Sequence, residues 1–222
     1  MNFTDKVISK HLDIVLLRTY DDGSKSIVKL IEKSKHRKGQ EYRITKALQA
    51  ANIKVPKVQG YHEIDLIYND NTYTEMMIIE YIPGSTTLER SYPKEEAKRI
   101  ALQMLDLVEK MHKTGYYHGD LHLGNFIWNG KELTLIDFGC SYNAEFWQKI
   151  NKKTFIGTSQ HAKSLCREIP QKFMLSGIEY DWEFYSHHEE NLLNNCISLL
   201  LAIECKNKSI EELRHVVNSL IG

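Results

Sequence analysis

The segment HGDLHLGNFIWNGKELTLIDFGCS, residues 118–141, constrains the fold more than any other part of the chain. It carries a polar cluster at each end, and the two clusters are separated by two short apolar runs with an Asn-Gly pair between them. An Asn-Gly pair flanked by such runs is typical of a tight β-hairpin turn. We therefore expect a hairpin that returns Asp137 to the neighbourhood of Asp120 and Asn125.

Two kinds of chemistry could use this arrangement. His118, Asp120 and His122 alternate with apolar residues or glycine, so on a strand they would face one side and could bind a divalent metal for hydrolysis. Alternatively, Asp120 could take a proton from an acceptor while Asn125 and Asp137 hold magnesium on a phosphate chain. The presence of both downstream residues favours the second interpretation over a metal-dependent hydrolase.

The same residues resemble the signature motifs of the protein-kinase-like phosphotransferase superfamily. His118 to Leu121 together with Asn125 is similar to the catalytic loop, and Asp137-Phe138-Gly139 is similar to the magnesium-binding motif. The form HGDLHxGN is closest to that of aminoglycoside and choline phosphotransferases, Bud-type and RIO kinases, and lipopolysaccharide heptose kinases. The resemblance extends from Lys29 to about Leu201.

The resemblance implies binding of ATP and Mg²⁺ by residues in the first half of the chain. Lys29, in the stretch Ile-Val-Lys-Leu, would contact the α- and β-phosphates. Its expected partner is Glu41, with Glu32 and Glu63 as alternatives. The stretch Ile79–Gly84 is similar to the hinge between kinase lobes, whose backbone, at Glu80 and Ile82, would hold the adenine.

The resemblance also assigns catalytic and metal-binding roles. Asp120 would orient and deprotonate the acceptor hydroxyl, and Asn125 and Asp137 would hold magnesium. Lys29, supported by Glu41, would neutralise phosphate charge. Such a site needs positioning and charge stabilisation rather than a covalent intermediate. A pseudokinase that only binds partners is the less favoured alternative, because these residues are all intact.

A later segment bears on the substrate. Gly157-Thr158, followed by His161-Ala162, is similar to the Gly-Thr-x-x-Tyr-Ala element of casein-kinase-1-like kinases, with histidine in place of tyrosine. In that group the element forms a platform for peptide substrates, which implies a serine or threonine acceptor on a protein. His122, where serine/threonine kinases usually have lysine, favours instead a small-molecule or lipopolysaccharide sugar kinase that phosphorylates an alcohol group.

The resemblance implies an α+β fold with two lobes, and the hydrophobic patterns, strand-rich at first and mostly helical later, agree with it. Residues 1–82 should form a small β-rich N-lobe, and residues 83–222 a mainly helical, truncated C-lobe. The expected elements are a hairpin over 14–31, a helix over 39–51, a strand over 74–82, and helices over 93–112, 188–203 and 210–221.

Two features depart from the kinase pattern or leave a choice open. No glycine-rich loop precedes Lys29, so any cover over the phosphates would be formed by Val7–His11 without glycine. The central C-lobe helix should begin near an acidic residue, for which Asp181, Glu189 and Glu190 are the candidates.

Composition limits the partners. The chain of 222 residues has 29 basic and 29 acidic side chains, so no nucleic-acid partner is expected. No apolar run reaches the roughly 20 residues that a membrane-spanning helix needs. The four cysteines lack C-x-x-C spacing, which favours a reducing, cytoplasmic location. Export into a host cell without a cleaved signal peptide is the alternative, and the sequence does not fix the oligomeric state.

Overall fold

The computed structural model describes residues 2–10, 13–32, 38–143 and 182–220 of the chain, with side chains from residue 189 onward in the last range. Gly157 and Thr158, predicted to form a substrate platform, lie outside the described residues, and so does Asp181.

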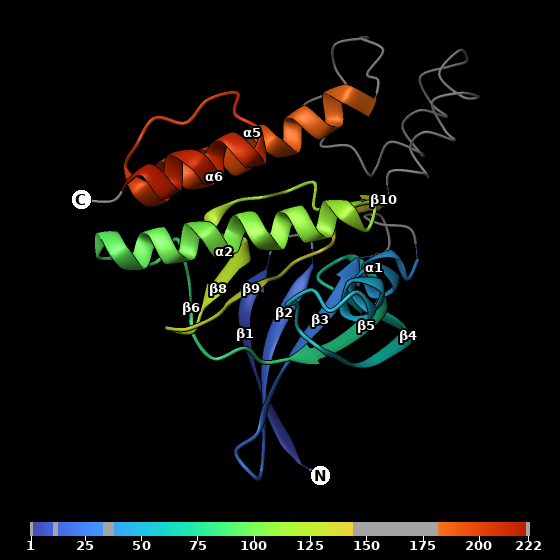
Figure 1. Cartoon of the computed structure of the whole chain (residues 1–222). Helices are drawn as coiled ribbons and strands as arrows, with labels where there is room; N and C mark the ends of the chain where they lie inside the picture. The colour runs from blue at the N-terminus through green and yellow to red at the C-terminus, as the bar shows by residue number, and fades with distance from the viewer. Residues whose placement is uncertain (1, 11–12, 33–37, 144–181, 221–222) are drawn as a thin grey trace, which may run out of the picture.

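The first part of the chain forms a five-stranded antiparallel sheet with one helix beside it (Figure 1). The spatial order of the strands is β1-β2-β3-β5-β4. The strands are β1 (Phe3–Lys10), β2 (Ile14–Tyr20), β3 (Lys25–Glu32), β4 (Val58–Tyr68) and β5 (Asn71–Glu80), and the helix is α1 (Gln40–Ala50).

The hairpin predicted over 14–31 is confirmed. β2 and β3 pair antiparallel, with Ile14 opposite Leu30 and Thr19 opposite Lys25. Val28 and Ile31 are both buried although they point to opposite faces of the sheet, and both are β-branched, as strands favour. The predicted helix over 39–51 agrees with α1 to within one residue at each end, and the predicted strand over 74–82 is the longer β5.

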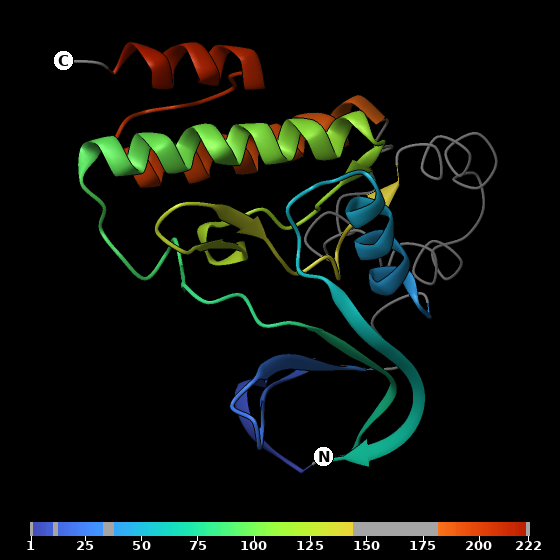
Figure 2. The ribbon, with the colours of Figure 1, turned by 60° about the horizontal axis from the view of Figure 1, so that its bottom comes forward.

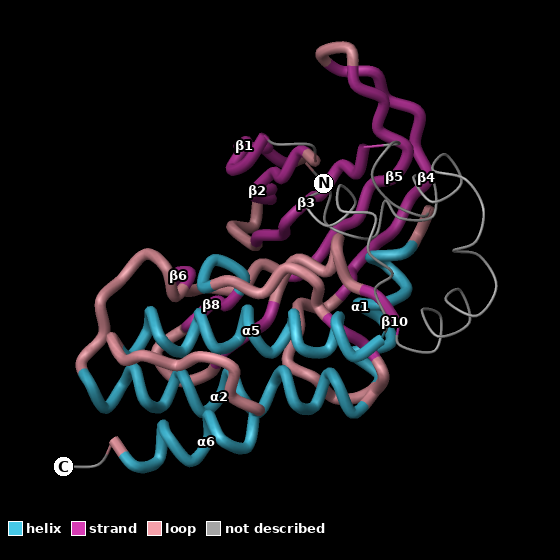
Figure 3. Tube along the Cα trace, turned by 90° about the horizontal axis from the view of Figure 1, so that it is seen from above, coloured by secondary structure: helices cyan, strands magenta, loops and turns pink. Residues whose placement is uncertain are grey.

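Three helices lie in the described residues of the second part of the chain. Figures 2 and 3 show them lying alongside one another, on the side of the small central strands away from the large sheet. The helix α5 begins six residues before the predicted start at His188, and a capping box formed by Ser209 and Glu212 starts α6. The helices are α2 (Lys94–Lys113), α5 (Trp182–Leu201) and α6 (Ile210–Ser219).

The main hydrophobic core lies between these helices and a central hairpin. The apolar face predicted for the long helix is buried along its whole length, because its residues recur every three or four positions. Phe126 and Leu135 contribute from the hairpin, Leu193 and Ile197 from α5, and Leu213 from α6. The chain thus has a β-rich part and a mainly helical part, a mixed α+β fold.

Short strands and one turn of 3-10 helix connect these elements at the centre of the molecule. β8 and β9 form the predicted hairpin, and β6 extends it to three strands. The segments are β6 (Ser85–Thr86), β7 (Tyr116–Tyr117), η1 (Leu123–Asn125), β8 (Phe126–Trp128), β9 (Leu133–Leu135) and β10 (Tyr142–Asn143). No helix in the described ranges is long and apolar enough to span a membrane. The lobe boundary at residue 82 stays a prediction.

Candidate active site

Lys29 is the centre of the candidate site. It lies on β3 with only 7% of its surface exposed, and its ammonium group faces three carboxylates. Nζ lies 2.9 Å from Glu41 Oε2, 2.8 Å from Asp137 Oδ1 and 3.5 Å from Asp13 Oδ2. The strand and helix that carry Lys29 and Glu41 are packed so that the predicted pair forms, whereas Glu63 pairs with Lys38 instead.

The charges of this cluster shift the pKa values of its members. Burial alone would lower the pKa of Lys29, but attraction to the three carboxylates raises the pKa well above its ordinary value. The positive charge of Lys29 holds the pKa of Asp137 well below its usual range. Glu41 is the most deeply buried of the three carboxylates. Burial raises its pKa to about 7, although Lys29 acts in the opposite direction.

A cleft of about 300 Å³ opens beside Lys29. All the residues predicted to bind the nucleotide line it, namely Lys29, Glu41, Glu80, Ile82 and Asp137. Apolar side chains form its walls: Val15, Ile27 and Ile79 come from the large sheet, and Ile127 and Ile136 from the central segment. A mostly apolar cleft with a cation among its lining residues suits a ligand that has an aromatic base and negative charge.

The first strand also reaches the cleft, in part where the sequence predicts a cover. Ile8 lines the cavity from β1, within the stretch Val7–His11 expected to lie over the phosphates. Residues 11 and 12, which follow β1 in the sequence, lie outside the described ranges.

The segment after β5 leaves the sheet at the cleft. Ser26 pairs with Glu80 as the last rung between β3 and β5. Glu80 is fixed by Lys57, which accepts from its backbone N–H at 2.8 Å and donates its own backbone N–H to the Glu80 carboxylate at 3.1 Å. Tyr81 and Ile82 follow β5, do not belong to a strand, and line the cavity.

Asp120 and Asn125 lie on one loop that closes on itself. The side-chain amide of Asn125, buried at 5% exposure, donates to the backbone oxygen of Asp120 at 2.9 Å. The side chain of Asp120 is 58% exposed. The backbone N–H of Ile136 donates to Asn125 O at 2.9 Å, so the central hairpin returns the Asp137 segment to this loop as predicted.

Glu189 holds the start of the same loop. Its two carboxylate oxygens accept the backbone N–H groups of His118 at 2.7 Å and Gly119 at 3.0 Å. Burial acts to raise the pKa of Glu189, but the neighbouring His112 and the His118 N–H outweigh it and lower the pKa below its ordinary value. Among the described residues, Glu189 is therefore the acidic anchor of α5; the sequence named it as one of three candidates.

Gly119 could not be replaced by a larger residue without rearrangement. Its φ is 78°, in the left-handed region, and a Cβ placed on it would lie 2.3 Å from the carbonyl oxygen of Cys140. This contact explains why the loop has glycine where many protein kinases have arginine. It also brings the segment after Asp137 directly against the loop that carries Asp120 and Asn125.

The segment after Asp137 is fixed from two sides. Asp137 has a φ of 65°, which is uncommon for a residue with a side chain and typical of functional sites. Ser141 donates its hydroxyl to His118 O at 3.0 Å, and its own carbonyl accepts from the Gln40 side chain at 2.8 Å. Gln40 begins α1, one residue before Glu41, so these two bonds of Ser141 connect the helix to the loop that begins at His118.

The histidines of the first polar cluster do not form the metal site of the hydrolase hypothesis. His118 is fully buried, where its Nε2 donates to Ile136 O at 2.9 Å and its ring packs edge-on against Phe138. His122 is half-exposed, and its Nδ1 accepts from Gly124 N at 3.1 Å. Across the described ranges, no three His, Cys, Asp or Glu side chains come together as a metal site.

One member of the central cluster was not predicted. Asp13 is 6% exposed, accepts the backbone N–H of Glu32 at 3.1 Å and adds a third negative charge beside Lys29. Its position directly before the β-branched run of β2 was the only signal for it, and an isolated acidic residue at a strand end is usually solvated.

Comparison with known proteins agrees with this geometry. The family model described as protein kinase domain matches residues 13–163, more than half of the chain. The human hormonally up-regulated neu tumor-associated kinase is 28% identical over 130 residues, 54% of this chain and 17% of that protein. Serine/threonine-protein kinase 1 of African swine fever virus is 31% identical over 124 residues, 53% of this chain and 39% of that protein.

A solved structure also resembles the chain. It is the Cydia pomonella granulovirus kinase PK-1, with 20% identity and a TM-score of 0.48 over 63% of this chain and 52% of that one. The chain thus matches well under half the length of the two curated relatives described above. On the family match over residues 13–163, the chain belongs to the protein kinase domain family.

Proposed function

We propose that the protein transfers the γ-phosphate of ATP, with Mg²⁺, to a serine or threonine hydroxyl of a protein substrate. The observation that carries this proposal is the buried Lys29, held between Glu41 and Asp137 at the end of an apolar cleft. A lysine in this setting supplies a fixed positive charge at one end of a nucleotide-sized cavity.

The nucleotide would lie along the cleft. The apolar walls around Val15 and Ile127 suit the two faces of an adenine ring, and the backbone of Tyr81 and Ile82 can hydrogen-bond its edge. The phosphates would then meet Lys29, while Glu41 keeps the ammonium group in position. Asp137 contacts the same ammonium group at 2.8 Å.

The donor set near the phosphates fits magnesium. Asn125 uses its amide nitrogen on Asp120 O, which leaves its amide oxygen for a cation, and the Asp137 carboxylate is half-exposed and ionised. Magnesium prefers few protein oxygens and completes its shell with phosphate and water. When bound, Mg²⁺ would neutralise phosphate charge during transfer.

Asp120 is proposed to be the residue that meets the acceptor. Its carboxylate is exposed while its backbone is fixed by Asn125, so the side chain can accept a hydrogen bond from an incoming hydroxyl and take its proton. His118 and Gly119, held by Glu189, set the direction in which the loop presents this side chain.

A protein acceptor is favoured by the family match and by the printed name of the viral relative, a serine/threonine-protein kinase. A cytoplasmic location is part of the same proposal. The second candidate, a kinase of small alcohols such as sugars, is favoured by His122, whose Nε2 lies 3.8 Å from Asp120 Oδ2 where lysine is usual in serine/threonine kinases.

Two substitutions test the proposal. Asp120→Asn should abolish phosphoryl transfer while leaving magnesium-nucleotide binding nearly unchanged, because this carboxylate acts on the acceptor. Asp137→Asn should weaken nucleotide binding in the presence of Mg²⁺. The measurements are transfer from labelled ATP in a cell lysate, with proteins separated from small molecules, and nucleotide titration by calorimetry.

The assay also separates the alternatives. Label confined to small molecules, with no phosphoserine or phosphothreonine by mass spectrometry, would establish the small-alcohol kinase. Wild-type turnover in both variants would contradict the assignment of this loop altogether.

A further inference from the structure

Three side chains that contact the beginning of α1 come from one face of the large sheet. Lys29 on β3 lies opposite Met77 on β5, and Glu75 lies two residues before Met77 on the same strand. Tyr61 on β4 also lies opposite Met77. Residues opposite each other share a face of a sheet, and so do residues two apart on one strand, so Lys29, Glu75 and Tyr61 lie on the same face. This is the part of the sheet against which α1 packs (Figure 1).

Glu75 and Tyr61 contact α1 on each side of Glu41. The backbone N–H of Gly39 donates to Glu75 Oε2 at 2.9 Å, and the hydroxyl of Tyr61 donates to the same oxygen at 3.0 Å. The ring of Tyr61 stacks on that of Tyr42, with the centroids 4.6 Å apart and the planes at 20°. The first turn of the helix is therefore fixed to the sheet at a residue before Glu41 and at the residue after it.

Glu75 replaces a contact that the helix does not make for itself. The N-cap of α1 is Gly39, which has no side chain to accept an N–H group. In a capping box, a glutamate or glutamine three residues after the N-cap accepts the N–H of the N-cap residue. Tyr42 stands at that position, and its ring is stacked on Tyr61 instead. Glu75 accepts this N–H from the neighbouring strand, and its negative charge suits the positive end of the helix dipole.

These contacts are shielded from water, which increases their importance. Glu75 is 4% exposed and Gly39 is also buried, so water cannot readily replace either partner if the other is lost. Burial raises the pKa of Tyr61 to about 12, and the hydrogen bond to Glu75 acts in the same direction. Tyr61 therefore keeps its proton and remains a donor to Glu75 at neutral pH.

We propose that Glu75 is a positioning residue of the kinase site, which holds the first turn of α1 so that Glu41 stays on Lys29. Gly39 precedes Glu41 by only two residues, so a displacement of Gly39 moves the Glu41 carboxylate as well. The proposal rests on the proposed function for what the pair of Lys29 and Glu41 does. It adds that the chain itself keeps this pair together, without a bound partner or a phosphate that brings α1 to the sheet.

The first test follows amide hydrogen exchange by NMR, without nucleotide. Glu75→Met has a side chain of similar size but no acceptor oxygen. The amides of Gly39 and of Arg43, which donates to Gly39 O at 3.0 Å, should exchange about tenfold faster in this variant. Glu75→Gln keeps an acceptor oxygen and should restore much of the protection. It also carries the same comparisons if Glu75→Met does not fold.

Glu63→Met is the matched control. Glu63 lies opposite Glu75 on β4, but its side chain is 65% exposed and pairs with the exposed Lys38, directly before Gly39. Loss of an exposed ion pair has little effect, so this variant should leave the exchange of both amides nearly unchanged. Equal exchange rates in Glu75→Met and the wild type would overturn the proposal.

The second test measures whether Lys29 stays in place. Lys29 is buried and paired with Glu41, so acetic anhydride should acylate it slowly in the wild type. In Glu75→Met we expect severalfold faster acylation of Lys29, relative to the exposed Lys46 of the same helix, when the products are quantified by mass spectrometry. Faster exchange at Gly39 with unchanged acylation of Lys29 would show that Glu75 fixes the turn without positioning the pair.

Kinetics then separate positioning from a general loss of stability. Glu75→Met should raise the Michaelis constant for ATP severalfold in the wild-type background and have little further effect in Glu41→Gln, where the pair is already lost. Equal effects in both backgrounds would contradict the proposal. If no variant and not even the wild type transferred phosphate, the proposed function would fail, whereas exchange and acylation would still decide whether Glu75 holds Glu41 on Lys29.

Discussion

The Cα of Gly119 lies so close to the carbonyl oxygen of Cys140 that a Cβ on this residue would stand 2.3 Å from it. The contact joins the loop of residues 118–125 to the segment after Asp137, and the first of four predictions follows from it.

Gly119→Ala should destabilise the fold strongly, because it adds a steric clash with backbone to the strain of a left-handed φ. Gly130→Ala is the matched control, since that glycine also has a positive φ, 94°, but has no atom within 4 Å of the added Cβ. We expect about 1 kcal/mol for Gly130→Ala and at least about 3 kcal/mol for Gly119→Ala, measured by urea unfolding. Equal losses of unfolding free energy in the two variants would show that the loop around Gly119 moves away from Cys140 to accommodate the added Cβ.

Glu189→Gln should loosen the catalytic loop. Glutamine keeps one acceptor oxygen, so either His118 or Gly119 loses the partner of its backbone N–H inside the protein. The expected loss is about 1–3 kcal/mol of unfolding free energy, with a fall in activity. Glu204→Gln, at an exposed position, is the control. Amide hydrogen exchange gives the specific readout, and unchanged protection of both amides in Glu189→Gln would contradict the prediction.

Glu41 should make stability depend on pH near neutrality. Its pKa is raised from 4.5 to about 7 in the folded protein, so the folded state binds more protons than the unfolded state between these values. The contribution of Glu41 to the free energy of unfolding is therefore largest at low pH and declines as the pH rises towards 7. Glu41→Gln removes this titrating group. The free energy of unfolding of the variant, relative to that of the wild type, should therefore increase as the pH is raised from 5 to 8. Urea unfolding at both pH values checks this, and a constant difference would refute it.

Asp13→Asn should strengthen binding of magnesium-nucleotide. Asp13 places negative charge 3.5 Å from Lys29 Nζ, where the proposed phosphates would also be attracted. Asparagine can still accept the Glu32 N–H but carries no charge, so we expect the Michaelis constant for ATP to fall severalfold with little change in kcat. A rise in this constant would show that Asp13 helps to hold Lys29 in place.

Much of this architecture could be predicted because local patterns and tertiary packing agree. The hairpin of β2 and β3, the helix α2 and the return of Asp137 to Asn125 follow from β-branched runs, helical spacing and an Asn-Gly turn. The Lys29 and Glu41 pair followed from the kinase resemblance, and the structure brings the two side chains together.

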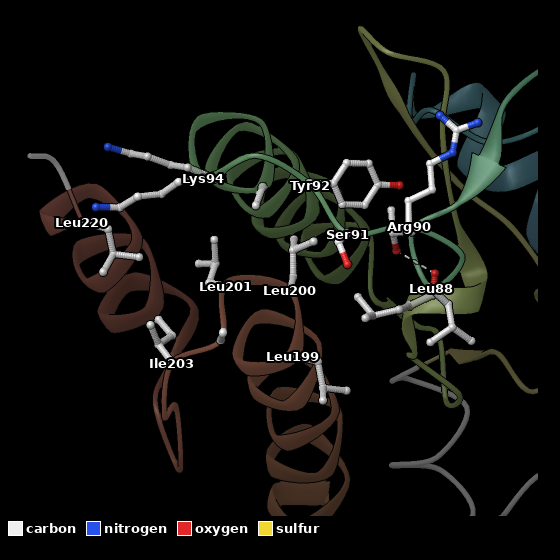
Figure 4. A pocket seen from close by; sticks show the side chains of 15 residues that line it. Leu88, Arg90, Ser91, Tyr92, Lys94, Leu199, Leu200, Leu201, Ile203 and Leu220 are labelled. Atoms are coloured by element: carbon white, nitrogen blue, oxygen red, sulfur yellow. Dashed lines mark hydrogen bonds between the residues drawn. The ribbon is translucent and has the colours of Figure 1, made fainter.

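What could not be predicted depends on contacts between distant parts of the chain. The role of Glu189 required α5 to pack beside a loop 70 residues earlier in the chain, and Glu190 has the same local sequence signal. Asp13, directly before β2, comes near Lys29 only because β2 pairs with β3. A second cavity, of about 590 Å³, is likewise lined by the segment before α2 and by the ends of α5 and α6, none of which has a recognisable motif (Figure 4).

The hydrogen bonds of Glu189 also determine how short a fragment of the chain can be and still hold the loop of Asp120 in place. The region matched by the family model ends at residue 163 and contains Lys29, Asp120, Asn125 and Asp137. A protein expressed only to that point would keep these side chains and lose the acceptor of two buried backbone amides. Gene truncations meant to isolate the enzyme therefore need to continue through α5, because the sequence motifs end before the part of the chain that holds them in place.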